Sequence, residues 1–183
     1  ENLRKYPLEE RLHLEKICHD ELSDLYMLCK DKRAEEQIGQ CIDLHRKWLA
    51  MDDRFERPHR DTTGYMMRAY AKMVYLRDLI SRDKLNEYYQ KCIGLARARG
   101  DMAEIYSTSA RYYQCTGDYE RAVAYIDSTI TVYKSKGIKA DLAPIYATQS
   151  YLYEEMGDYK NALKAVRTTN NIRFNERVEE AQS

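Results

Sequence analysis

The sequence predicts an all-α protein built from antiparallel pairs of helices. Turn-forming residues are scarce, with 7 Gly and 3 Pro in 183 residues, which is too few for a protein of many short strands and tight turns. In addition, the tripeptide Gly117-Asp118-Tyr119 recurs forty residues later as Gly157-Asp158-Tyr159. A recurrence at such a period is typical of stacked helical units.

The segment around the first tripeptide shows what each unit contains. From Tyr119 onward the apolar positions follow the i, i+3, i+4, i+7 spacing of one helix face: Tyr119, Ala122, Val123, Ile126, Ile130 and Tyr133. Gly117 suits the left-handed residue that ends a helix, and Asp118 suits the N-cap of the next. Tyr119 is therefore expected to be the first core anchor of a second helix, in a pair that covers 101–137.

The residues around the tripeptide recur as well, which predicts a second pair over 141–175. The matched positions are Tyr106, Ala110, Tyr113, Ala122 and Ile126 in the first copy and Tyr146, Ser150, Tyr153, Ala162 and Val166 in the second. The small residues Ala122 and Ala162 are expected to be buried where two helices cross closely.

Weaker copies lie upstream. A shift of 37 residues aligns Ala69, Met73 and Leu76 with the first-helix sites, and a further shift of 51 aligns Cys18, Leu22 and Leu25. These matches predict degenerate pairs over 64–100 and 8–50, with a charged loop from Met51 to Gly64 between them. We interpret 1–183 as a single domain whose last helix, 171–183, is expected to continue in a longer protein.

The pattern resembles the tetratricopeptide repeat (TPR) family. The matching positions are Ala110, Tyr113, Gly117, Tyr119, Ala122 and Ile126, and again Ser150, Tyr153, Gly157, Tyr159, Ala162 and Val166. The period of forty exceeds the usual 34 or so residues, the closing Pro is missing, and Tyr106 and Tyr146 replace the early Trp. The resemblance implies a right-handed superhelix of about four antiparallel helix pairs.

In that family, successive first-helix residues one turn apart line an inner groove. Carried over by matching, they are Tyr70, Val74, Arg77, Ser107, Arg111, Gln114, Ala147, Tyr151 and Glu154. The resemblance therefore implies a site for a protein or peptide, in which Arg77 and Arg111 could clamp a carboxylate. Alternatively, the two arginines pair with Asp78 or Glu154 on neighbouring helices. The chain has 17 Tyr against 2 Phe and 1 Trp, and Tyr suits both repeat packing and recognition.

Composition restricts the function classes. The 30 basic and 30 acidic residues give no net charge, which argues against a nucleic-acid partner and against a polybasic membrane patch. The five cysteines are widely spaced without a Cys-x-x-Cys pair, and we interpret them as buried thiols of a reducing compartment. No segment approaches the length of a membrane-spanning helix, so we expect no membrane contact by this chain itself.

No sequence motif points to catalysis or to a cofactor. The sequence lacks the nucleophile elbow, the zinc-protease motif and the glycine-rich phosphate loops. Cys41 and His45 stand at i and i+4, but two ligands do not make a zinc site. We therefore expect no catalytic residues, no metal and no cofactor.

The sequence thus favours a non-catalytic scaffold that binds a protein or peptide. The chain resembles the TPR region of bacterial sensor kinases and of TPR-bearing regulators, which implies the sensory or regulatory part of a larger signalling protein. The alternative is a cytoplasmic regulator that binds a signalling peptide or a response regulator. The partner could also be the protein's own downstream region or a second copy in a homodimer. The cysteines favour the cytoplasm, whereas a sensor region of a membrane kinase would be periplasmic.

Overall fold

The computed structural model describes residues 7–54, 61–138 and 142–182, and these residues form helices and turns without a strand. The prediction of an all-α protein is confirmed. Along the chain the helices are α1 (Leu8–Leu28), α2 (Arg33–Arg54), α3 (Thr62–Val74), α4 (Arg82–Arg99), α5 (Met102–Thr116), α6 (Tyr119–Ser135), α7 (Leu142–Glu155) and α8 (Tyr159–Gln182). The chain divides into two compact units, Glu1–Gly100 and Asp101–Ser183.

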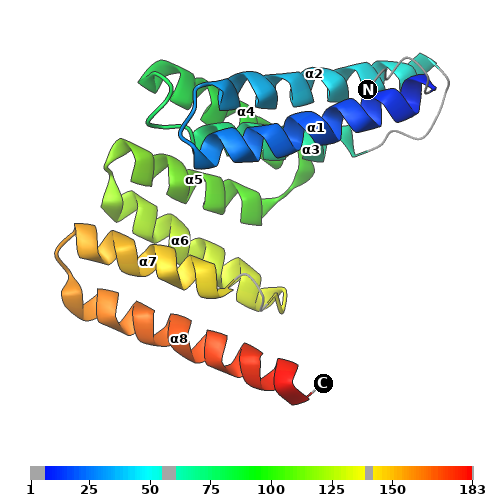
Figure 1. The fold of residues 1–183 in the computed structure, drawn as a ribbon. Helices are drawn as coiled ribbons and strands as arrows, with labels where there is room; N and C mark the ends of the chain where they lie inside the picture. Colours follow the sequence, from blue (N-terminus) through cyan, green and yellow to red (C-terminus); the bar gives the residue numbers. More distant parts are fainter. Residues whose placement is uncertain (1–6, 55–60, 139–141, 183) are drawn as a thin grey trace. The chain divides into compact units, whose positions relative to one another are not determined.

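Each unit consists of two helix hairpins. In the first unit α1 packs on α2, α2 on α3, and α3 on α4; in the second unit α5 packs on α6, α6 on α7, and α7 on α8 (Figure 1). The second helix of one hairpin therefore packs on the first helix of the next hairpin in both units.

The turns of the second unit form as their residues predict. Gly117 and Gly157 have positive φ angles of 82° and 75°, a conformation that glycine adopts without steric cost. The Asp118 and Asp158 carboxylates accept hydrogen bonds from the backbone N–H groups of Arg121 (3.2 Å) and Asn161 (3.1 Å). The helices α6 and α8 consequently begin at Tyr119 and Tyr159.

The core of the second unit lies between α5, α6 and α7. Its buried residues are Ala110, Ala122, Val123, Ile126, Ile130 and Leu152. Tyr113 and Tyr125 pack against this core, and their rings stack on each other with centroids 5.4 Å apart. Ala122 and Ala162 are both buried, as the sequence predicts.

In the first unit, polar contacts join helices that are not consecutive. The Lys72 ammonium of α3 lies 2.8 Å from both Asp20 and Asp24 of α1. At the start of α2, the Glu35 carboxylate accepts hydrogen bonds from Lys84 and Tyr88 of α4. These contacts supplement a core in which Ile38, Val74 and Cys92 are almost fully buried.

Two expected boundaries are wrong. The predicted loop from Met51 to Gly64 is helical at both ends, since α2 continues to Arg54 and α3 begins at Thr62, while residues 55–60 lie outside the described residues. Met51 extends the stripe of Leu44 and Trp48 that packs on Leu12, and the Asp61 carboxylate caps α3 at Gly64 N–H.

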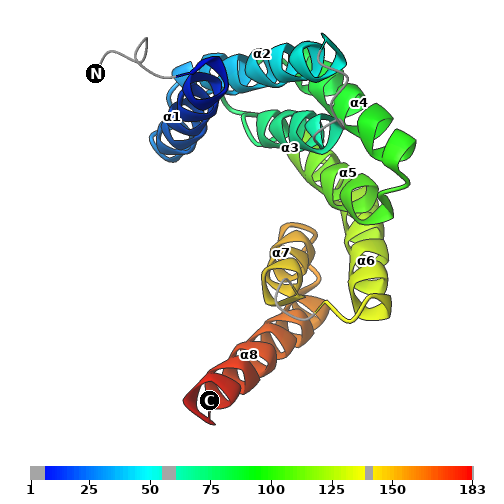
Figure 2. The same cartoon turned by 90° about the vertical axis from the view of Figure 1, so that its right-hand side faces the viewer.

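The predicted final helix over 171–183 is also wrong as a separate element, because α8 is continuous from Tyr159 to Gln182. Helix α8 has 24 residues against 14 in α7. It therefore extends beyond the end of α7, as Figure 2 shows.

Candidate binding pocket

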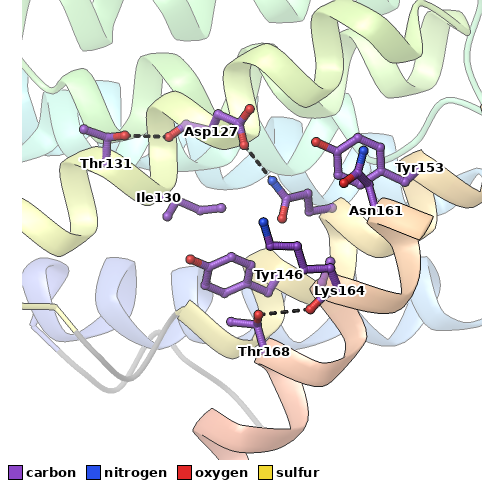
Figure 3. Close-up of a pocket in the computed structure, with 10 residues that line it drawn as sticks. Asp127, Ile130, Thr131, Tyr146, Tyr153, Asn161, Lys164 and Thr168 are labelled. Carbon is purple, nitrogen blue, oxygen red and sulfur yellow. Dashed lines mark hydrogen bonds between the residues drawn. The ribbon is translucent and has the colours of Figure 1, made fainter. Parts of the chain in front are cut away.

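The second unit contains a pocket of about 440 Å³ between α6, α7 and α8. Its lining is mainly polar and aromatic: Asp127, Ile130, Thr131, Tyr146, Gln149, Tyr153, Asn161, Lys164, Ala165 and Thr168. Figure 3 shows these side chains converging from the three helices. Consecutive hairpin packing thus brings together residues that are up to 41 positions apart in the sequence.

One side of the pocket is fixed by a hydrogen bond between α6 and α7. The Gln149 amide, which is 8% exposed, donates to the Asp127 carboxylate at 2.6 Å. Burial raises the pKa of Asp127, an effect that the hydrogen bond from Gln149 partly opposes. A carboxylate acceptor in this position is suited to a ligand that brings an N–H donor.

Helix α8 supplies the opposite side. The Asn161 side-chain amide, which lines the pocket, donates a hydrogen bond to the Asp158 carboxylate at 2.6 Å. The Lys164 side chain extends from α8 toward the pocket (Figure 3). Among the residues that the structure describes, no carboxylate lies within ion-pair distance of the Lys164 ammonium.

Two tyrosines of α7 complete the walls. The Lys134 ammonium lies 5.5 Å from the centroid of the Tyr146 ring, which holds that ring by a cation–π contact. The pKa of Tyr153 is raised by burial and, less strongly, by the charges of Asp127 and Asp158. The Tyr153 phenol therefore remains protonated at neutral pH, and both side chains present an apolar ring with a polar tip.

The sequence-derived residues of the first unit do not form an open surface. Tyr70 and Val74 are buried, because α3 packs on both α2 and α4. The Tyr70 ring stacks on Tyr88 of α4, and its hydroxyl accepts a hydrogen bond from Arg46 of α2 at 3.3 Å. The exposed Arg77 guanidinium lies 3.4 Å from the carboxylate of the adjacent residue Asp78, a contact within one turn and not the expected one between neighbouring helices.

The sequence-derived site residues of the second unit lie outside the pocket. On α5, the half-buried Arg111 donates to Gln114, itself buried, at 2.8 Å, and the Ser107 hydroxyl donates to the Glu104 carbonyl. On α7, Ala147 is half-buried while Tyr151 and Glu154 are exposed. The pocket uses other residues of α7, namely Tyr146, Gln149 and Tyr153.

The sequence carried one signal for this pocket. Gln149 stands at helical spacing between Tyr146 and Tyr153, which makes it a polar residue in an otherwise aromatic stripe. A buried polar residue normally has a hydrogen-bond partner. Its partner Asp127 comes from another helix and could be identified only from the tertiary structure.

Cys41 and His45 belong to the core of the first unit. The Cys41 thiol lies 3.8 Å from the Lys16 carbonyl, and the His45 ring stacks on Tyr65 with centroids 4.7 Å apart. Burial raises the pKa of Cys41 to about 11 and lowers the pKa of His45 to about 4. Over residues 7–54, 61–138 and 142–182, no three His, Cys, Asp or Glu side chains are grouped to hold a metal ion. Cys18 and Cys29 are exposed, contrary to the expectation that the cysteines are buried.

Comparison with known proteins gives little further information. No family model matches the chain, and no curated protein matches it. One similar solved structure is that of BtubC (BKLC) from P. vanneervenii, with 15% sequence identity, coverage of 94% of this chain and 93% of that chain, and a TM-score of 0.42. A likeness this distant carries no argument about fold or function. No helix of the described residues combines the length and apolar character that a membrane span requires.

Proposed function

We propose that this protein is a non-catalytic scaffold of the TPR type, with hairpins stacked in a right-handed superhelix, that binds an acidic peptide segment in the pocket between α6, α7 and α8. Two kinds of observation support the proposal. The hairpins pack consecutively within each unit, and the Gly-Asp-Tyr turns begin α6 and α8 in the same way.

The observation that carries the choice of ligand is the Lys164 ammonium. It lines a polar pocket beside the phenols of Tyr146 and Tyr153, and it has no carboxylate partner among the described residues. A carboxylate from an acidic side chain or from a peptide C-terminus would give Lys164 a charge-assisted hydrogen bond. The Asp127 carboxylate, which also lines the pocket, would accept an N–H group from the peptide backbone.

A peptide panel tests the proposal. Labelled peptides that carry Asp or Glu are compared with matched peptides that carry Asn or Gln, by fluorescence polarisation. We expect the acidic peptides to bind more tightly, and we expect Lys164→Gln to lower their affinity roughly ten- to hundredfold, because a hydrogen bond to a charged group contributes about 1.5–3 kcal/mol.

Lys160→Gln is the matched control. Lys160 is also an exposed lysine of α8, but it does not line the pocket, so its removal should leave the affinity unchanged. Equal affinities of wild-type protein and Lys164→Gln, or equal losses in the two variants, would show that the pocket does not recognise the carboxylate.

A further inference from the structure

The first and last described helices, α1 and α8, each leave an apolar face open. On α8 the exposed apolar residues include Tyr159, Leu163, Val166 and Phe174, and on α1 they include Ile17, Leu22, Leu25 and Leu28. Exposed apolar stripes of this kind mark surfaces that bind a partner.

The repeat shows which kind of surface fits the open face of α8. A shift of forty residues aligns α6 with α8, and both helices begin at the aligned tyrosine. Residues that α7 covers on α6 correspond to residues that are open on α8. The paired exposed fractions are 9% for Val123 and 52% for Leu163, then 5% for Ile126 and 40% for Val166. The open face of α8 is thus the equivalent of the α6 face that packs on α7.

The same alignment identifies the open face of α1. The repeat shifts of 40, 37 and 51 residues together align α1 with α7 at a distance of 128 residues. At this shift Leu28, the last residue of α1, falls one position after Glu155, the last residue of α7. The α7 residues that pack on the core with α6 are Leu142, Ile145, Tyr146 and Tyr153. Their counterparts on α1 are Leu14, Ile17, Cys18 and Leu25. Asp24, the counterpart of Leu152, departs from the pattern and pairs with Lys72 instead.

The charges of α1 and α8 are also complementary. Helix α1 carries six carboxylates against two cationic side chains, and α8 carries five cationic side chains against three carboxylates. The polar contact between α6 and α7 is the hydrogen bond from Gln149 to Asp127. At the equivalent positions α8 has Arg167 and α1 has Glu21, both exposed, so the hydrogen bond is replaced by an opposite-charge pair.

We propose that the open face of α8 binds the open face of α1 on a second copy of this chain, head to tail, in the manner in which α6 packs on α7. Arg167 would then pair with Glu21 of the second copy. Such an interface is heterologous: each copy offers α8 to one neighbour and α1 to another, so association does not stop at two copies. This proposal is independent of the peptide pocket, which lies on another face of α8.

Blocked-face variants test it. Leu25→Arg disables only the α1 face and Leu163→Glu disables only the α8 face. Sedimentation equilibrium of wild-type protein, with a reductant because Cys18 is exposed, should show a mass that rises above 21.7 kDa between micromolar and millimolar concentration. Each variant alone should remain monomeric, and an equimolar mixture should form a species of about twice 21.7 kDa and stop there.

Charge exchange tests the pairing of the two helices. Glu21→Arg and Arg167→Glu should each weaken association about tenfold or more, because like charges then face each other across the interface. The double variant, which restores opposite charges, should associate within about threefold of wild type. Met102→Glu, an exposed position outside both faces, is the control and should associate like wild type.

Several results would overturn the proposal: a wild-type chain that stays at 21.7 kDa at every concentration, a blocked-face variant that still associates, or a mixture that stays monomeric. Failure of the double charge variant to recover would overturn the specific pairing. Circular dichroism checks that each variant is folded. If one is not, Ile17→Arg and Val166→Glu block the same two faces and must give the same pattern.

Discussion

The third and fourth hairpins, α5–α6 and α7–α8, share a sequence pattern but not the environment of their second helices. The turn residues adopt the same conformation in both, with Gly117 and Gly157 at positive φ and Asp118 and Asp158 as caps. The apolar face of α6 is buried by α7, whereas the equivalent face of α8 is open in the single chain. Local features of a repeat thus follow its own residues, while burial follows its neighbour.

The tyrosines of the two Gly-Asp-Tyr tripeptides show this difference in burial. The Tyr119 side chain is half-buried and its hydroxyl donates to Glu155 of α7 at 3.2 Å. Tyr159, the same residue of the same tripeptide, is 71% exposed. Tyr159 is therefore not a core anchor as Tyr119 was expected to be, because no described helix packs on this side of α8.

The largest expected difference is between Ile126→Ala and Val166→Ala. Truncation of the buried Ile126 leaves a cavity and should lower the free energy of unfolding by about 2–5 kcal/mol. Val166 is 40% exposed, and its truncation should change stability by no more than about 0.5 kcal/mol. Urea denaturation at low protein concentration, where α8 is uncovered, measures both values. Equal losses would contradict the difference in burial.

Substitution of the turn glycines Gly117 and Gly157 should lower stability equally in the two hairpins. Gly117→Ala and Gly157→Ala each force a Cβ into the left-handed region, which costs about 1–2 kcal/mol. No neighbouring atom lies within 4 Å of a Cβ added at either position, so the cost comes from the backbone alone and should be equal in the two hairpins. Thermal unfolding of the two variants checks this, and a loss confined to one of them would show that the two turns are not equivalent.

The smallest effect concerns Asp127 and depends on pH. Because burial raises the pKa of Asp127 in the folded protein, the ionised carboxylate destabilises the fold at neutral pH. Asp127→Asn keeps an acceptor for Gln149 and should be slightly more stable than wild type at pH 7. As the pH falls through the raised folded pKa toward the unfolded value of 3.8, wild type regains this stability and the difference should vanish.

Denaturation curves of wild type and Asp127→Asn over this pH range measure the effect. Arg167, the equivalent residue of α8, has no carboxyl group to titrate, so Arg167→Gln should show no such acid-dependent difference. If the difference in the free energy of unfolding between Asp127→Asn and wild type grows as the pH falls, the assigned direction of the pKa shift of Asp127 is wrong.

The sequence by itself determined the helical class, the positions of the Gly-Asp turns and the burial of Ala122 and Ala162, since spacing and capping act within a few residues of the chain. Only the tertiary structure decided which faces are covered. Packing of α3 on both α2 and α4 buried Tyr70 and Val74, which the resemblance had assigned to a groove. Packing of α6 on α7 joined Asp127 to Gln149 and formed the pocket. These contacts depend on which helix lies opposite, and a repeat period does not specify that.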